Sequence, residues 1–269
     1  MSELSTAVEE ITLPPQKTSK CRECKTEHDR KIFQQELSVC PSCGWHASLT
    51  AQQWIDHLAD PDTFREIGKR LYSADPLEFS VTEPYRERLR EAEQRTGMHE
   101  AALSGKARLD GRPLVLISLE FDFLGGTMGS VVGEKVARAF QVATRRKLPV
   151  VSILASGGAR IQEGMLALMQ MAKTATAVAA HKAAGLPYLS VLTNPSFGGT
   201  FASFGSLGDI LIGEPGAQIG FVGARVVEGT IAERIPKEER SAETVLKHGM
   251  IDMITPRPAL RNQLAVLIS

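Results

Sequence analysis

From Gly111 onward, the chain repeats one order three times: an apolar run, a glycine-rich loop and a stretch with helical periodicity. The apolar runs are Pro113–Ser118, Pro149–Leu154 and Pro187–Leu192. Each has the length and the continuous apolar character of a strand that is buried on both faces. Strands that alternate with helices form a sheet covered by helices. The order therefore predicts an α/β domain whose glycine loops follow the carboxyl ends of its strands.

The segments between the predicted strands place apolar residues at helical spacing. One face consists of Val132, Val136, Ala139, Phe140 and Ala143, and a second helix has a face of Met165, Leu168, Met169, Ala172, Thr176 and Ala179. Because residues at this spacing share one side of a helix, we assign both faces, together with Met171, to the core. A further helix is predicted over Pro84–Arg95, where Glu and Arg alternate on a solvated face, and we give it a structural role.

All four cysteines fall within one short segment. Cys21 and Cys24 are separated by two residues, fifteen residues follow, and Cys40 and Cys43 repeat the two-residue spacing. This spacing is typical of a zinc ribbon, in which two turns each give two thiolates to one tetrahedral ion. Four thiolates leave no open position on the metal, so we expect a structural zinc ion. Competing ligands nearby are His28 and His46, and reduced thiols or disulfides without metal are further alternatives.

The charge balance limits what the whole chain can bind. Lys plus Arg number 31 and Asp plus Glu number 31, so no net positive field draws the protein to nucleic acid or anionic lipid. Basic residues surround the ribbon, but acidic residues are interleaved with them and no aromatic ladder is present. Nucleic-acid binding is therefore an alternative that we do not favour. No apolar stretch reaches the roughly 18 residues of a membrane span.

Composition divides the chain into four parts. We expect a disordered tail at residues 1–20, the zinc ribbon at 21–50, a helical connector at 51–97 and the main α/β domain at 98–269. The tail lacks the basic start and the apolar stretch of a secretory signal. We therefore expect a cytoplasmic protein.

The glycines of the main domain gather in three loops, Leu124–Ser130, Ala155–Gly164 and Thr193–Thr200. Glycine pairs permit strained turns, and bare amides at a helix N-terminus can point at a ligand oxygen. Two such amides would polarise a thioester carbonyl and stabilise the enolate that forms when the α-carbon loses a proton. The loops therefore indicate an acyl-CoA site, although a single Gly-Gly turn often serves only to connect two elements.

Several other chemistries lack their motifs. No loop matches G-x-x-x-x-G-K-[ST] or G-x-G-x-x-G, which disfavours nucleotide and dinucleotide sites. The main domain has no G-x-S-x-G elbow and no cysteine, so we assign no covalent nucleophile. We interpret Ser156 as a turn residue.

The loops also carry a resemblance to a known family. The segments GGTMGSVVG (125–133), ASGGARIQE (155–163), LMQMAKT (168–174) and GLPYLSVLT (185–193) closely resemble the beta subunit of bacterial acetyl-CoA carboxylase carboxyltransferases. The similarity runs from Cys21 to about Ile268. It implies a crotonase-like (ClpP/crotonase) spiral domain preceded by a small four-cysteine zinc ribbon.

The resemblance also implies a reaction and its partners. Carboxylate would pass from carboxybiotin, held on a separate biotin carboxyl carrier protein, to acetyl-CoA, giving malonyl-CoA. An alpha subunit of related fold would complete an α2β2 complex. The catalytic groups would be the backbone amides of Gly158 and Ala159, which hold the thioester oxygen. The substrate-binding residues that we expect are Gly125, Gly126, Gly157, Arg160, Gly198 and Gly199.

The cations nearest the loops are Arg160 and Arg225. Either would suit a CoA phosphate or the transferred carboxylate, and an ion pair that stabilises the fold is the alternative. Crotonase folds also host hydratases and decarboxylases, and Glu134 and Glu163 stand where a catalytic acid would reach a thioester. Both glutamates also suit the first turn of a helix, which is the role that we favour.

The chain departs from the family pattern in its third glycine loop. Thr200, Phe201 and Gly205 stand where the family more often has Val, a small polar residue and Ala. These differences permit a paralogue that acts on another acyl-CoA or decarboxylates malonyl-CoA in a specialised pathway.

Overall fold

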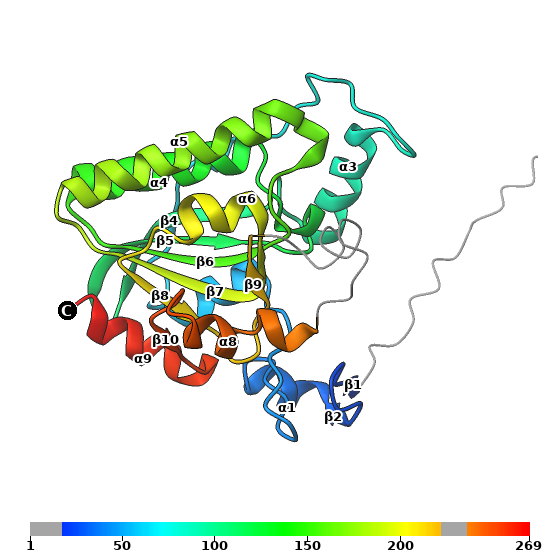
Figure 1. Ribbon diagram of the computed structural model, residues 1–269, viewed down its shortest axis with the longest axis vertical. Coiled ribbons are helices and arrows are strands. Elements are labelled where there is room, and N and C mark those ends of the chain that lie inside the picture. Colours follow the sequence, from blue (N-terminus) through cyan, green and yellow to red (C-terminus); the bar gives the residue numbers. More distant parts are fainter. Residues whose placement is uncertain (1–17, 222–235) are drawn as a thin grey trace, which may run out of the picture. The chain divides into compact units, whose positions relative to one another are not determined.

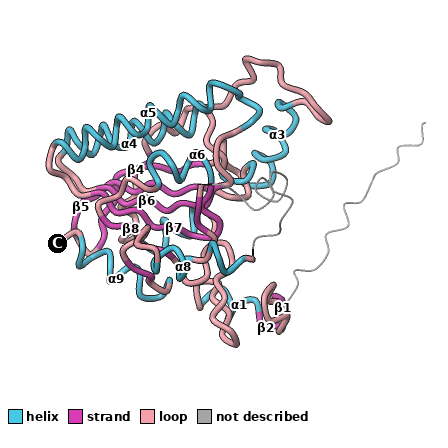
Figure 2. The backbone as a smooth tube through the Cα atoms, viewed as in Figure 1, coloured by secondary structure: helices cyan, strands magenta, loops and turns pink. Residues whose placement is uncertain are grey.

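The computed structural model describes residues 18–221 and 236–269 (Figures 1 and 2). The chain divides into two compact units, residues 1–47 and 48–269. The division precedes the predicted end of the ribbon at residue 50, so the last ribbon residues belong with the larger unit. Of the predicted tail, only Thr18–Lys20 is described, and it forms a strand.

The small unit contains a strand pair and one short helix. β1 (Thr18–Lys20) and β2 (Glu27–Asp29) are antiparallel. The helix α1 (Arg30–Gln35) follows directly, and the Asp29 carboxylate accepts a hydrogen bond from the Lys31 amide at 2.7 Å. This contact satisfies one of the free amides at the start of the helix.

Each cysteine pair of the small unit lies on a tight backbone turn. The Lys25 amide donates to the Cys21 carbonyl at 3.1 Å, and the Gly44 amide donates to the Cys40 carbonyl at 2.8 Å. Lys25 and Gly44 have φ values of 63° and 73°, the left-handed conformation in which these turns close. The two turns bring the four sulfur atoms together, and Phe33 packs in the same buried cluster.

A mixed sheet forms the centre of the larger unit. Its strand order is β10-β8-β7-β6-β5-β4-β3, and β9 pairs with β7. The strands are β3 (Arg65–Glu66), β4 (Ala102–Leu109), β5 (Arg112–Leu119), β6 (Val150–Ser156), β7 (Tyr188–Phe197), β8 (Ile210–Gly213), β9 (Ile219–Gly220) and β10 (Met253–Ile254). From β5 to β10 the neighbours are parallel, whereas β4 is antiparallel to both β5 and β3. The three predicted apolar strands are confirmed as β5, β6 and β7.

Helices cover both faces of this sheet (Figure 1). The longer helices are α2 (Ala51–Leu58), α3 (Tyr85–Thr96), α4 (Ser130–Arg146), α5 (Gly164–Ala183), α8 (Ala242–Lys247) and α9 (Arg257–Leu267). Along β6, Val150 and Leu154 face one core beside α4, whereas Val151 and Ile153 face a second core beside α2 and α9. Burial on both faces explains why this strand reads as a continuous apolar run.

The predicted core face of α5 is wrong, whereas that of α4 is confirmed as buried. Met165, Leu168 and Met169 are 66%, 49% and 58% exposed. The buried residues of α5 are instead Ala167, Gln170, Thr174, Val178 and His181, and the remaining predicted core residues Ala172, Thr176 and Ala179 are exposed. Small and apolar residues surround this helix on all sides, so periodicity cannot decide its orientation. The contact with α4 decides it, because a Cβ at Gly133 would overlap the Gln170 side chain.

None of the helices in the described ranges combines the length and the apolar character that crossing a membrane requires.

A buried ion pair joins α9 to the end of β8. The Arg257 guanidinium donates to both carboxylate oxygens of Glu214 at 2.7 and 3.0 Å and lies 4.9 Å from the centre of the Trp54 ring. Both charged side chains are 2% exposed. Breaking this buried pair would remove two charge-assisted hydrogen bonds from the core.

We expect Glu214→Ala to lower the free energy of unfolding by about 3–5 kcal/mol, because the buried Arg257 guanidinium would lose the carboxylate that accepts two of its hydrogen bonds. The matched control is Lys182→Ala, which removes a pair whose side chains are 42% and 40% exposed. That change should cost less than about 1 kcal/mol. Urea unfolding of both variants measures the difference, and equal losses would contradict it.

Candidate functional site

Three glycine loops meet at the carboxyl ends of β5, β6 and β7. The first contains the turn η1 (Leu124–Gly126), the second contains η2 (Ile161–Glu163), and the third opens α6 (Gly198–Thr200) and η3 (Phe201–Gly205). Because these strands are parallel neighbours, their loops emerge at the same edge of the sheet (Figure 1). This is the edge at which open α/β sheets bind ligands.

Backbone hydrogen bonds join the first loop to the second. The Met128 amide donates to the Gly158 carbonyl at 2.8 Å, and the Arg160 amide donates to the Met128 carbonyl at 3.0 Å. The Gly157 amide donates to the Gly125 carbonyl at 2.8 Å. These three bonds join the two loops through their backbones.

The second and third loops touch through bare backbone. Gly158 and Gly198 have φ values of 117° and 63°, conformations that favour glycine. A Cβ at Gly158 would stand 3.1 Å from the Gly198 Cα, and a Cβ at Gly198 would stand 2.8 Å from the Gly158 Cα. Only glycine at both positions permits this approach without displacing one loop.

The amide of Ala159, unlike that of Gly158, has no hydrogen-bond partner among the described residues. The Gly158 amide donates to Ser156 Oγ at 3.1 Å, and Ser156 Oγ donates to Thr200 Oγ1 at 2.9 Å. Ala159 is partly exposed and lies between the two backbone bonds to Met128. Within the described ranges, its amide has no acceptor. Of the two amides expected to hold a thioester oxygen, the structure leaves one available.

The other predicted binding glycines lie on the same three loops, in different surroundings. Gly157 is exposed, and a Cβ there would meet only ordinary van der Waals neighbours. A Cβ at Gly199 would stand 3.4 Å from the Ala159 Cβ, so the third loop adjoins the same point. Gly125 is partly exposed, whereas Gly126 is buried against a backbone carbonyl that a Cβ would overlap. Gly126 therefore serves close packing beneath the loops.

Arg160 is buried, which does not fit the direct substrate contact expected of it. Its guanidinium donates to both Glu100 carboxylate oxygens at 2.9 and 2.6 Å and to the Thr127 carbonyl at 2.8 Å. Burial alone would raise the pKa of Glu100, but the charge and hydrogen bonds of Arg160 hold that pKa below its usual range. The ion pair within the fold is the alternative that the structure supports. Arg225 lies outside the described residues.

Each candidate acid has partners among the described residues. A hydrogen bond from Lys173 holds the pKa of Glu134 below its usual range. Glu163 is 1% exposed and accepts hydrogen bonds from Tyr85 Oη at 2.7 Å and from the Ser130 amide at 2.6 Å. Glu163 therefore caps the N-terminus of α4 instead of the first turn of its own helix. Both contacts support structural roles.

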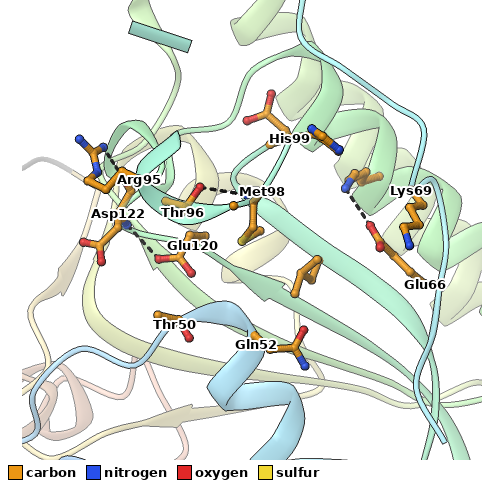
Figure 3. A pocket seen from close by; sticks show the side chains of 14 residues that line it. Thr50, Gln52, Glu66, Lys69, Arg95, Thr96, Met98, His99, Glu120 and Asp122 are labelled. Carbon is orange, nitrogen blue, oxygen red and sulfur yellow. Dashed lines mark hydrogen bonds and ion pairs between the residues drawn. The ribbon is translucent and has the colours of Figure 1, made fainter. Parts of the chain in front are cut away.

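A cavity of about 410 Å³, whose lining residues include Glu100, is shown in Figure 3. Lys135 in its wall pairs with Glu66 at 3.2 Å. Burial raises the pKa of Glu120, whose carboxylate accepts a hydrogen bond from the Asp122 amide at 3.1 Å. Because these charges find partners within the protein, we place the candidate site at the glycine loops.

The four cysteines of the small unit fit a tetrahedral metal ion. Their sulfur atoms lie within 4.8 Å of one another, with Cys21 and Cys43 at 3.8 Å and Cys24 and Cys40 at 3.7 Å. Thiolates about 2.3 Å from one zinc ion in tetrahedral geometry stand about 3.8 Å apart. The His28 Nε2 atom is 3.3 Å from the Cys40 sulfur, so this histidine adjoins the cysteine set.

Sequence reasoning missed the polar residues that support the loops. Tyr85 and Glu100 contact Arg160 across 75 and 60 positions of the chain, and local spacing contains no signal for such contacts. Ser156 and Thr200 stood within the predicted loops, and their hydroxyl groups beside glycine pairs were the available signal.

Comparison with known proteins agrees with this architecture. The carboxyl transferase domain family matches residues 46–260. The chain is 47% identical over 251 residues to the acetyl-coenzyme A carboxylase carboxyl transferase subunit beta of Synechococcus sp. (strain JA-3-3Ab), covering 93% of this chain and 80% of that protein. It is 46% identical over 249 residues to the subunits beta/alpha protein of Frankia alni, covering 93% of this chain and 41% of that protein.

A solved structure extends the likeness to the fold. Transcarboxylase 12S, with methylmalonyl-coenzyme A and methylmalonic acid bound, superposes with a TM-score of 0.68 at 22% identity, over 88% of this chain and 44% of that chain. The predicted crotonase-like fold is confirmed. The chain therefore belongs to the carboxyl transferase domain family and, within it, to the acetyl-coenzyme A carboxylase carboxyl transferase beta subunits.

Proposed function

We propose that this chain, in the cytoplasm, holds acetyl-CoA while carboxybiotin on a separate carrier protein delivers carboxylate, so that malonyl-CoA forms. The observation that supports the proposal best is the Ala159 amide, which has no acceptor among the described residues where three glycine loops meet. A thioester oxygen that accepts from this amide gains negative charge as the α-carbon loses its proton. A preorganised donor is worth most at that moment.

The proposed chemistry needs no covalent intermediate on the protein. The enolate carbon attacks the carboxyl carbon of carboxybiotin, a C–C bond forms, and the N–C bond to biotin breaks. The biotin nitrogen takes up a proton, which balances the one that acetyl-CoA loses. Placing the two reactants about 3 Å apart supplies much of the rate, because no side chain of the described loops stands as a nucleophile.

Gly157 offers a clean test of where the thioester lies. We expect Gly157→Val to lower kcat/KM for acetyl-CoA at least about 100-fold, because the side chain would fill the space beside the Ala159 amide and block a donor worth roughly 10² to 10³ in rate. A Cβ at Gly157 stands 3.6 Å or more from its neighbours, so the fold should tolerate the change.

The melting temperature and the zinc content of Gly157→Val serve as controls for folding. Full activity of this variant would place the thioester elsewhere. Gly158 is less suitable for the test, because any side chain there is strained and meets the third loop.

An alpha subunit is the partner that we propose for the exposed apolar face of α5. Met165, Leu168 and Met169 on α5 are 66%, 49% and 58% exposed, and Ile161, at the end of the second glycine loop just before α5, is 74% exposed. Scattered apolar residues are common on surfaces, but a contiguous set marks an interface. In the Frankia alni relative, beta and alpha regions belong to one protein. An alpha subunit on this face would also supply the wall that orients carboxybiotin, in an α2β2 complex.

We expect the isolated chain to have little carboxyltransferase activity and to gain it when mixed with its cognate alpha subunit. Met169→Glu should weaken that gain at least about tenfold, because a charge would be buried at the interface. Val266→Glu is the matched control. Val266 is also exposed, at 68%, but it lies on α9, which packs against the other face of the sheet.

The assay is malonyl-CoA decarboxylation with biotin or a biotinylated carrier as acceptor, read as a titration with alpha subunit. Full activity of the isolated chain would contradict the two-subunit proposal. Equal losses in the two variants would contradict the choice of the α5 face.

We propose that the cysteine set holds one structural zinc ion, which would crosslink the two turns of the small unit. Zinc binding supplies folding energy to small units of this kind. All four positions are filled by thiolates, so no open position would remain for water or substrate.

We expect Cys40→Ser to abolish zinc binding, because a neutral hydroxyl replaces a thiolate ligand. His28→Gln should retain one zinc ion per chain, since the imidazole contacts a sulfur atom and is not part of the ligand set. Elemental analysis and proteolysis of residues 18–47 measure both effects. Loss of zinc in His28→Gln with retention in Cys40→Ser would reverse the assignment.

The acyl group has one alternative that rests on a specific contact. Thr200, a departure from the family pattern, donates to the Gly158 carbonyl at 3.1 Å and so lies at the junction of the second and third loops. A paralogue that uses another acyl-CoA is therefore the second candidate. Comparison of acetyl-CoA with propionyl-CoA in the two-subunit assay distinguishes the two.

A further inference from the structure

Four ionisable side chains lie buried together beneath the glycine loops, and the proposed chemistry uses none of them. Tyr85 comes from α3, Glu100 precedes β4, and Arg160 and Glu163 lie in the last part of the second loop. Each is at most 1% exposed. Ionisable groups are rarely buried without a specific role, because their desolvation is costly.

Arg160 binds the first loop at Thr127 through hydrogen bonds. Its guanidinium donates to the Thr127 carbonyl at 2.8 Å and to Thr127 Oγ1 at 3.2 Å. The same guanidinium is fixed from below by Glu100 at 2.6 and 2.9 Å and by Tyr85 Oη at 3.1 Å. A planar guanidinium held on several sides has one orientation.

Glu163 binds the carboxyl-terminal end of the first loop. Its carboxylate accepts from the Ser130 amide at 2.6 Å, at the start of α4, and from Tyr85 Oη at 2.7 Å. A side chain at Gly129 would overlap this carboxylate, so the loop approaches it closely. Gly129 offers no side chain to cap α4, and Glu163 takes that place.

These two contacts stand on either side of Met128, the residue whose backbone pairs with the second loop on both sides of Ala159. The first loop is therefore held at three successive points, Thr127, Met128 and Ser130, by the segment that carries the Ala159 amide. Buried contacts leave little freedom for the peptide between them. The direction of the Ala159 N–H follows from these contacts.

We propose that Arg160 and Glu163 are positioning residues, held in place by Glu100 and Tyr85, that aim the Ala159 amide at the thioester oxygen without touching substrate. The inference rests on the proposed function for its kinetic consequence. A buried ion pair is by itself weak evidence for stability, since apolar residues of similar volume often serve as well. A fixed backbone direction is what the charged pair adds.

The test compares two buried arginines, each paired with a buried glutamate. Arg160→Lys retains the charge opposite Glu100 but cannot also reach the Thr127 carbonyl in the same geometry. Arg257→Lys makes the same change at the Glu214 pair, which contacts none of the glycine loops through any bond described. Both variants should melt earlier than the unaltered protein. Only the first should misdirect the amide.

In the complex with the alpha subunit, we expect Arg160→Lys to lower kcat about 10- to 100-fold, a part of the loss that follows removal of one oxyanion donor. The KM for acetyl-CoA should stay within about twofold, because a donor that acts mainly on the transition state affects kcat and kcat/KM equally. Arg257→Lys should retain kcat at temperatures where it is folded. Equal kcat in the two variants would overturn the proposal.

A second readout does not depend on activity. Hydrogen–deuterium exchange of the peptide that spans residues 155–163 should be faster in Arg160→Lys than in Arg257→Lys. If Arg160→Lys fails to fold, Tyr85→Phe serves instead, because it removes only the hydroxyl that joins Arg160 to Glu163. Unchanged exchange and unchanged kcat in that variant would equally overturn the proposal.

The two proposals fail in different ways. Absence of acetyl-CoA carboxylation by the unaltered complex would refute the proposed function, while faster exchange in Arg160→Lys would still support the positioning of the loop. Full activity of the unaltered complex and of Arg160→Lys would refute the positioning role alone.

Discussion

The contact on which the site depends is the backbone pairing of the first and second glycine loops around Met128. Its amide and carbonyl bind Gly158 and Arg160, so Ala159 is the one residue between them whose amide has no acceptor within the described residues. The pairing needs parallel strands whose ends lie side by side, which β5 and β6 provide. The third loop then closes against the second where Gly198 meets Gly158 without side chains.

Sequence predicted the parts of this arrangement that are local. The strands were recognisable because burial on both faces demands a continuous apolar run, and the cysteine set was recognisable because two short turns fix its spacing. The orientation of α5 was not recognisable, because apolar residues such as Met165 and Met169 occur on several sides of this helix. The contact between Gly133 and Gln170 decides which side is buried. That decision depends on the contact between two helices, about which the periodicity of one helix contains no information.

The sequence predicted which loops form the candidate site, but it did not predict which backbone amide in those loops is available. Gly158 and Ala159 are equivalent as backbone donors in the sequence, and the Ser156 hydroxyl distinguishes them by accepting from the Gly158 amide. The role of Arg160 also depends on a distant residue, because Glu100 holds its guanidinium in a buried ion pair beneath the loops. From the sequence alone, a cation beside glycine loops suggests a contact with a ligand. The structure shows instead that this cation pairs with a buried carboxylate.

The chemistry proposed here explains why so much polar structure lies below the loops. When a side chain acts as base or nucleophile, it can adjust its rotamer as the reaction proceeds. A backbone amide cannot, so its direction must be correct before substrate arrives. Among the described loop residues, catalysis would rest on such an amide. The buried charges of Arg160 and Glu163 are then best understood as the means by which a flexible glycine sequence is held in one conformation.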